Sequence, residues 1–135
     1  MAEVRYLTAD DVLTLTEYFL RRLGYSPPIL RGDGRALLDS AVNRARAAAY
    51  CVGADLASQA AALANGVAPN RPFVDGNKRG AWAACIAFVW LNGRRLRTDA
   101  LVPLARKIIE VQEMTEKSQA DGAMAEWLRS HLEHR

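Results

Sequence analysis

The stretch that decides the fold is Asn77-Lys-Arg-Gly-Ala-Trp-Ala-Ala-Cys-Ile-Ala-Phe-Val-Trp-Leu91, which is followed by Asn92-Gly93. It contains no proline, and its only charged residues, Lys78 and Arg79, stand in the first turn. Every residue from Ala81 to Leu91 is apolar, which predicts a helix that is surrounded by other elements. We therefore expect this helix, from about residue 77 to 91, to be the centre of the domain and to hold its polar first turn rigidly.

Three helices are predicted before this segment. The first begins after Thr8-Ala-Asp-Asp11, a capping box with Asp in place of the usual Glu, and ends before Gly24. The second covers about Arg35 to Val52, and the third is capped by Asp55. The segment from Pro69 to Gly76 contains two prolines and a glycine, so we expect a loop there. The apolar stripes are Val12, Leu15, Phe19 and Leu23 in the first helix and Leu56, Ala60, Leu63 and Val67 in the third.

Two more helices are predicted after the central one. The fifth tolerates Pro103 in its first turn, and the last is introduced by Ser118-Gln-Ala-Asp121. Between Gly93 and the fifth helix, Arg94 to Thr98 is a short extended piece that could pair with Val4 to Leu7. The sequence thus predicts an all-α bundle with at most a minor pair of short strands. The packing residues of these helices are Leu101, Leu104, Ile108 and Val111 in the fifth and Trp127, Leu128 and Leu132 in the last.

Length and composition predict a single domain over residues 1–135. Half of the 135 residues are hydrophobic and 24% are charged, which is enough apolar material for one core without disulfide or metal staples. Cys51 and Cys85 have no CxxC spacing and fit reduced, buried thiols. The apolar run is too short to cross a membrane, and the first residues lack a basic-then-apolar leader. We therefore expect a cytoplasmic protein.

Charge gives little support to direct nucleic-acid binding. The net charge is +3, from 18 basic and 15 acidic residues. Arginines occur in small groups between acidic residues, as at Arg21-Arg22 and Arg94-Arg95, whereas a nucleic-acid binder gathers its charge on one face. A solvated, arginine-rich surface is the expected result.

The segment Arg71-Pro-Phe-Val-Asp-Gly-Asn-Lys-Arg79 brings a helix N-terminus together with two cations and a carboxylate. The N–H groups of a first helical turn are unpaired and carry partial positive charge, so phosphate oxygens bind there. Gly76 lets the backbone approach closely, and Lys78 and Arg79 add charge-assisted contacts. Asp75 supplies a hard oxygen ligand for a magnesium ion bridging those phosphates. Chemistry alone therefore predicts a nucleotide phosphate site.

A purely structural interpretation of the same residues also stays open. Asp75 would then only cap the helix, and Gly76 would only relieve a turn. Lys78 and Arg79 would be solvated. In either interpretation, Phe73 anchors the loop to the core.

In these residues the sequence resembles the Fic/Doc family, whose motif runs H-x-F-x-[D/E]-[G/A]-N-[K/G]-R. The resemblance extends over nearly the whole chain and favours the death-on-curing (Doc) branch, with its loop after Gly24 and its apolar helix ending at Asn92-Gly93. It implies a compact Fic/Doc helical bundle. Six of the nine motif positions match in register, namely Phe73, Asp75, Gly76, Asn77, Lys78 and Arg79.

The resemblance implies a function as well. Doc-like members are toxins of toxin–antitoxin pairs that move the γ-phosphate of ATP onto a threonine of elongation factor Tu, which halts translation. On this basis Asp75 holds the magnesium, and Gly76, Asn77, Lys78 and Arg79 hold the phosphates of ATP. The chain shows no inhibitory [S/T]xxxE[G/N] helix, so the expected partner is a Phd-like antitoxin whose disordered C-terminal segment folds on binding.

The departure from the motif is Arg71, at the position of the family's catalytic histidine. Histidine accepts a proton near neutral pH, whereas arginine, with a pKa above about 12, has no lone pair to offer. His131 and His134 are the only histidines. We expect both to be solvated residues of the last helix, with no part in catalysis. The chain as written is therefore predicted to be inactive.

Two explanations of Arg71 compete. In the first, Arg71 is an inactivating substitution, which one base change in a histidine codon produces. In the second, Arg71 is native to a non-catalytic member that binds nucleotide or peptide. Retention of Asp75, Asn77, Lys78 and Arg79 favours the first. A second catalytic alternative is AMP transfer, but members with that activity usually have glycine at the position of Lys78 and a second arginine where this chain has Trp82.

Overall fold

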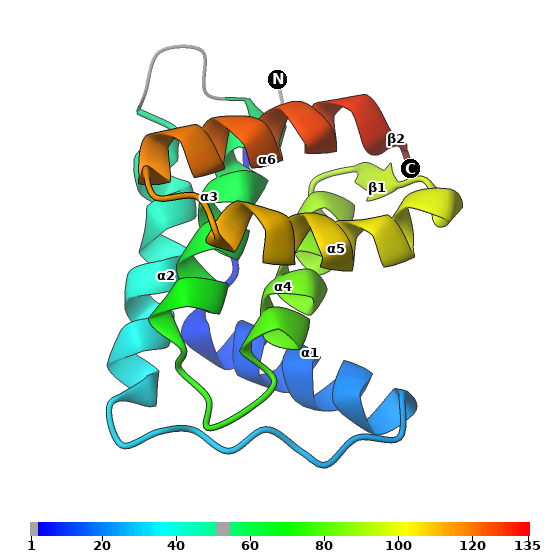
Figure 1. The fold of residues 1–135 in the computed structure, drawn as a ribbon. Coiled ribbons are helices and arrows are strands. Elements are labelled where there is room, and N and C mark those ends of the chain that lie inside the picture. The colour runs from blue at the N-terminus through cyan, green and yellow to red at the C-terminus, as the bar shows by residue number, and fades with distance from the viewer. Residues whose placement is uncertain (1–2, 51–54) are drawn as a thin grey trace.

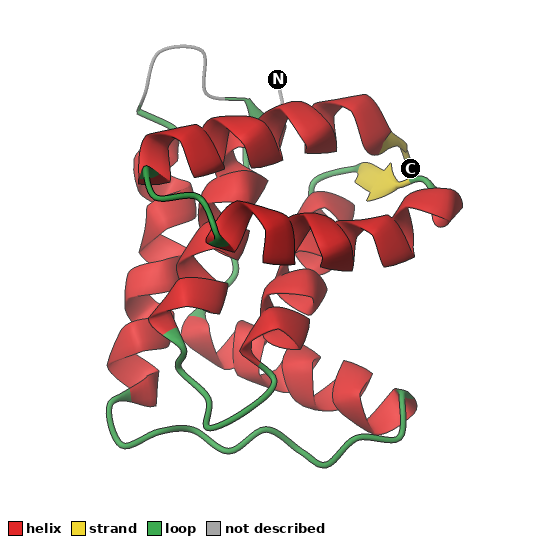
Figure 2. Ribbon diagram, viewed as in Figure 1, coloured by secondary structure: helices red, strands yellow, loops and turns green. Residues whose placement is uncertain are grey.

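A computed structural model of the chain describes residues 3–50 and 55–135, and Figures 1 and 2 show its path and its secondary structure. The described residues are predominantly helical, which confirms the predicted all-α fold. The elements are α1 (Ala9–Arg22), α2 (Gly34–Ala48), α3 (Leu56–Asn70), α4 (Asn77–Leu91), β1 (Arg94–Leu96), the 3-10 turn η1 (Thr98–Ala100), α5 (Leu101–Gln112), α6 (Lys117–His131) and β2 (Leu132–His134).

Local capping chemistry sets the helix starts that the sequence predicted best. The Thr8 hydroxyl accepts a hydrogen bond from the Asp11 N–H at 3.1 Å, and the Asp11 carboxylate accepts one from the Thr8 N–H at 2.8 Å, so the predicted capping box is present. The bounds of α4 also agree with the prediction. In contrast, α2 ends at Ala48, before the predicted end at Val52, which lies outside the described residues together with Cys51.

Helix α3 takes the central position that the sequence assigned to α4. It contacts α2, α4, α5 and α6 (Figure 1). Its residues 59–68 are buried without interruption. Its alanines and Gly66 let neighbouring backbones approach closely, since a Cβ at Gly66 would lie 3.0 Å from the Ala41 Cα. The apolar end of α4 instead reaches the surface, where Trp90 is half exposed. The prediction of α4 as the wrapped helix was therefore wrong in part.

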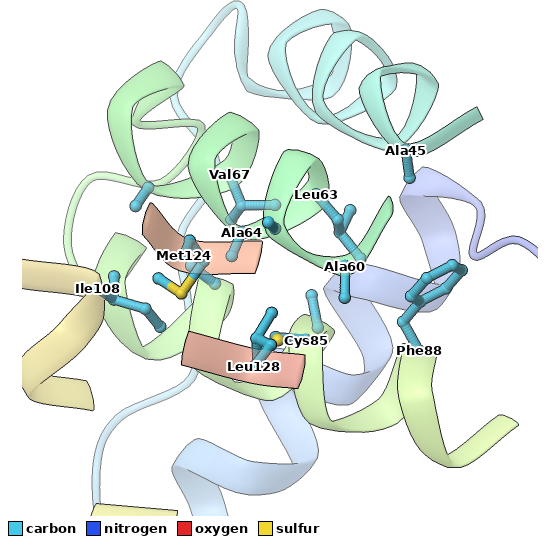
Figure 3. Close-up of a cluster of buried hydrophobic side chains, with 14 of the residues drawn as sticks. Ala45, Ala60, Leu63, Ala64, Val67, Cys85, Phe88, Ile108, Met124 and Leu128 are labelled. Atoms are coloured by element: carbon cyan, nitrogen blue, oxygen red, sulfur yellow. The ribbon is translucent and has the colours of Figure 1, made fainter. Parts of the chain in front are cut away.

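The core lies where α2, α4, α5 and α6 meet around α3. Figure 3 shows side chains of α2, α3, α4, α5 and α6 turned toward one another. Cys85 is fully buried among them, and burial raises the pKa of its thiol to about 12. This confirms Cys85 as a small buried hydrophobe, as the sequence predicted.

A polar network joins three helices at the edge of this core. Asn65, almost fully buried on α3, donates a hydrogen bond to the Asp121 carboxylate at 2.7 Å, and Arg44 of α2 pairs with that carboxylate at 3.1 Å. Asp121 therefore ties α6 to α2 and α3. The sequence predicted that Ser118 to Asp121 introduces the last helix. These residues instead lie inside α6, which already begins at Lys117 after Glu116.

The short strands pair differently from the prediction. Strand β1 pairs antiparallel with β2 at the C-terminal end, so that Leu96 faces Leu132. The segment from Val4 to Leu7 forms no strand, because the Asn92 side chain bonds both the N–H and the carbonyl of Arg5, at 2.7 and 2.9 Å. Leu132 and His134 accordingly lie in β2 and not in the last helix.

The loop before α4 is shorter than predicted. Helix α3 continues through Pro69 and ends at Asn70. Only one helical residue follows Pro69, so the missing N–H of the proline weakens only the last turn of α3. The loop therefore covers 71–76.

The surface carries many arginines paired with carboxylates. Arg21 pairs with Glu17, and Arg95 with Glu133. Such pairs divide the positive charge over the surface instead of concentrating it. No helix in the described part of the chain combines the length and the apolar character that crossing a membrane requires.

Asp55 makes the stability of the fold dependent on pH. Hydrogen bonds from Arg129 at 2.8 and 3.1 Å, with a bond from the Ser58 N–H, hold the pKa of its carboxyl well below the ordinary 3.8. Because this pKa is lowered in the folded chain, the stabilisation is complete above the ordinary value and is lost as pH falls toward the lowered one.

We expect Asp55→Ala to lower the free energy of unfolding by about 1 kcal/mol at neutral pH, and by less in acid. Urea unfolding at pH 7 and at about pH 2.5 measures both values. Asp33→Ala is the control, because Asp33 precedes α2 without capping it through its side chain. A loss that stays the same at both pH values would contradict the assignment.

Candidate functional site

The site begins where α3 ends. Arg71 closes that helix in the left-handed conformation, with φ of 51°, and its side chain is exposed. Phe73, only two residues further, is 1% exposed and forms an isolated antiparallel bridge with Leu30. The predicted anchor is thus present, and it fixes the loop against the segment that leads into α2.

Asn77 ties this loop to the first turn of α4. Its side-chain oxygen accepts a hydrogen bond from the Phe73 N–H at 2.9 Å, and its side-chain nitrogen donates one to the Phe73 carbonyl at 3.0 Å. Both partners are buried, so these bonds set the shape of the loop. The Asn77 side chain is thereby engaged in holding the loop, so any contact of Asn77 with an anion falls to its backbone N–H.

Gly76 turns the chain into α4. Its φ of 82° lies in the left-handed region that favours glycine. The Asp75 carboxylate accepts a hydrogen bond from the Gly76 N–H at 2.8 Å, and no side chain in the described part of the chain caps α4. Asp75 is therefore not the cap of this helix, and the N–H groups of its first turn stay open to an anion.

One cavity of about 720 Å³ adjoins the helix start, and the predicted site residues line it together. Its lining combines the polar and charged residues at the start of α4 with apolar side chains of α1, α4 and α5. The site residues in its lining are Arg71, Asp75, Gly76, Asn77, Lys78 and Arg79. The apolar lining includes Phe19, Leu20, Leu23, Trp82, Val102 and Ile109.

Trp82 joins the helix start to the rest of the cavity. Its indole N–H donates a hydrogen bond to the Leu101 carbonyl at 2.8 Å. Its ring packs edge-to-face against the Phe19 ring, with centroids 5.8 Å apart. Trp82 thus links α4 to both α1 and α5. From the sequence, Trp82 stood out only because AMP-transferring members of the family usually have an arginine at its position.

The two histidines lie apart from the site, since neither lines the cavity. His131 stacks on Trp127 with ring centroids 4.1 Å apart, and its Nδ1 lies 2.7 Å from the Trp127 carbonyl. His131 is therefore half buried, which corrects the prediction that it is solvated, while His134 is exposed in β2.

Several lining residues were missed by the sequence analysis. Tyr25 packs beside Arg79, and Val102 and Ile109 form the outer wall on α5. The spacing of Val102 and Ile109 is a usable signal, because residues seven apart share a helix face, and this pair lies beside the core stripe instead of in it. Tyr25 gave no signal, since it stands in a loop.

The site thus combines an uncapped start of α4, a loop anchored by Phe73, and the Asp-Gly-Asn-Lys-Arg series of residues 75–79. The sequence model of the Fic/DOC family matches residues 6–89, and the chain belongs to this family. The protein named Toxin Doc from Mycolicibacterium smegmatis (strain ATCC 700084 / mc(2)155) is 41% identical over 106 residues, which cover 77% of each chain. The predicted resemblance is confirmed.

Proposed function

We propose that this chain is a Doc-like toxin of a toxin–antitoxin pair, built for kinase-type transfer of the γ-phosphate of ATP and disabled by Arg71. The single observation that carries the proposal is the open N-terminus of α4, which lines one cavity with a carboxylate and two cations. The similarity to Toxin Doc supports the toxin part of it. A target in the translation machinery, elongation factor Tu, would make this a cytoplasmic reaction.

The residues present suit a nucleotide with its magnesium ion. The N–H groups of the first turn of α4, with Lys78 and Arg79, would hold phosphate oxygens. Asp75 is exposed beside them and would hold the metal, which binds proteins through one or two carboxylates plus phosphate. When bound, magnesium neutralises charge on the phosphates. No group of three or more His, Cys, Asp or Glu side chains in the described ranges is arranged to hold a metal ion.

The side chain at position 71 decides whether the acceptor hydroxyl can lose its proton to the protein. In γ-phosphate transfer, an acceptor hydroxyl gives up its proton, its oxygen bonds to the γ-phosphorus, and ADP leaves. A neutral histidine at position 71 would take that proton. Arg71 is permanently protonated and cannot, although its charge still favours phosphate binding.

Two alternatives make different predictions. AMP transfer would place the α-phosphate at the reacting position, and Trp82, a bulky indole bonded to Leu101, stands where such members usually carry a second arginine. A non-catalytic binding module would keep Arg71 as a native phosphate ligand.

The proposal is tested with the Arg71→His protein, elongation factor Tu and ATP labelled separately at the α- and γ-phosphates. We expect label in the acceptor only from γ-labelled ATP, and none with the parent chain. Label from α-labelled ATP would favour AMP transfer. No label from either nucleotide would favour the binding module.

The apolar walls of the cavity fit the predicted antitoxin. Leu23, Val102 and Ile109 are large apolar side chains that remain well exposed along α1 and α5. An amphipathic helix can bury its apolar face there while its acidic side chains meet Arg71 or Arg79. A disordered antitoxin segment that folds in this groove would also cover the phosphate site.

We expect binding of the antitoxin segment to show a strongly negative heat-capacity change, because folding and burial are coupled. Calorimetry at several temperatures measures it.

Ile109→Glu should weaken binding of the antitoxin segment at least about tenfold, since a buried unpaired charge is costly. Met114→Glu is the control, because Met114 is similarly exposed but lies outside the cavity. An antitoxin that is already helical when free, or that leaves ATP binding unchanged, would contradict this mechanism.

A further inference from the structure

The guanidinium of Arg79, a cation of the candidate site, lies over the aromatic ring of Tyr25. The guanidinium carbon of Arg79 is 3.9 Å from the centroid of that ring. The next shortest such contact in the described part of the chain, between Arg135 and Trp90, measures 5.0 Å. At 3.9 Å the two planar groups are in direct contact, which is the range of a strong cation–π interaction.

The position of Tyr25 is set by the end of α1 and not by the loop that follows. Gly24 adopts φ of 83° and reverses the chain, and the Tyr25 N–H then donates a hydrogen bond to the Leu20 carbonyl at 2.8 Å. This is the bond pattern of a glycine-terminated helix. The backbone that carries the ring is therefore fixed by the end of α1.

The stack leaves the charge of Arg79 available. Among the residues that the structure describes, Arg79 forms no ion pair with a carboxylate. An aromatic face contacts the face of a guanidinium, whereas the N–H donors of arginine lie in its plane. Tyr25 can thus fix the side chain without occupying the donors that a phosphate would use.

The stack also adjoins two cavities. Tyr25 and Arg79 line both the main cavity and a second one of about 310 Å³ beside the Ser26–Ile29 loop. Without the ring, the Arg79 side chain would lose a contact on the boundary that the two cavities share. The ring of Tyr25 therefore restricts where the Arg79 guanidinium can lie between the start of α4 and the second cavity.

We propose that Tyr25 is a positioning residue that holds the Arg79 guanidinium toward the phosphate site. The proposal rests on the nucleotide function proposed above. It predicts a role for the aromatic face alone, so that the hydroxyl of Tyr25 is dispensable.

The test combines side-chain NMR of Arg79 with calorimetric titration of Mg–ATP. Ring currents should shift the Arg79 side-chain protons upfield in the parent and in Tyr25→Phe, and the shift should vanish in Tyr25→Leu. The Tyr25→Leu change should weaken Mg–ATP binding about three- to fivefold, as expected for a partly exposed cation–π contact. Tyr25→Phe should bind like the parent, and Tyr18→Leu is the control at a similarly exposed tyrosine of α1 outside both cavities.

A double-mutant cycle separates positioning from a general structural effect. In an Arg79→Ala background, Tyr25→Leu should cause no further loss of affinity. An equal loss in that background, or an unchanged affinity for Tyr25→Leu in the parent, would overturn the role of Tyr25 while the nucleotide site stands. Absence of Mg–ATP binding by the parent would overturn both.

Discussion

Expression of the Arg71→His protein should arrest bacterial growth, whereas the parent chain should be harmless. The substitution supplies a base where the parent has a permanent cation, and general-base catalysis contributes roughly a factor of 100 to 10,000 in rate. The rest of the site is already assembled, since Asp75, Lys78 and Arg79 line the same cavity as position 71. Growth curves after induction measure the effect.

The matched control is Arg71→Gln, which removes the charge of Arg71 without supplying a base. It should be as harmless as the parent. Arrest by Arg71→Gln would show that loss of the arginine, and not gain of the histidine, releases toxicity. If Arg71→His is harmless in a host whose translation machinery is a valid target, the disabled-toxin account fails.

Gly34→Ala should destabilise the fold strongly, by about 2 kcal/mol or more, as overpacking against rigid atoms does. A Cβ at Gly34 would lie 2.3 Å from the Pro72 carbonyl oxygen, and backbone cannot move aside as a flexible side chain does. The clash would displace Pro72, which lies in the loop between Arg71 and Phe73. Loss of stability should therefore be accompanied by weaker nucleotide binding.

Gly32→Ala provides the control two residues away, because nothing lies within 4 Å of a Cβ there. Its free energy of unfolding should stay within about 0.5 kcal/mol of the parent value, as for an ordinary surface change. Urea unfolding compares the two variants. Equal stability of both would mean that the close packing of α2 on the site loop is not as described.

Helix positions were predictable where a local signal sets them. The Thr8 capping box and the change from the Pro- and Gly-containing loop to a helix after Gly76 both depend on residues that are neighbours in sequence. Burial was less predictable. Helix α4 has the more continuous apolar run, but α3 is the more buried helix, because its small residues permit close approach from several sides.

Predictions that depended on distant segments failed for an equally physical reason. A three-residue strand has too few residues to specify its partner, and β1 pairs with Leu132–His134 because α6 delivers that segment beside it. The candidate site divides in the same way. Its cations and its carboxylate lie in one continuous segment, whereas Tyr25, from the loop after α1, and Ile109, from α5, reach the cavity through the tertiary fold.

The measurement that tests the central claim most directly is the affinity of the parent chain for adenosine, AMP, ADP and ATP, each with magnesium. If the start of α4 holds phosphates, affinity should rise with every phosphate added and should fall as salt is raised. Lys78→Ala should reduce the gain for ATP and leave adenosine unaffected. Equal binding of adenosine and ATP, or no binding of ATP at all, would contradict the account.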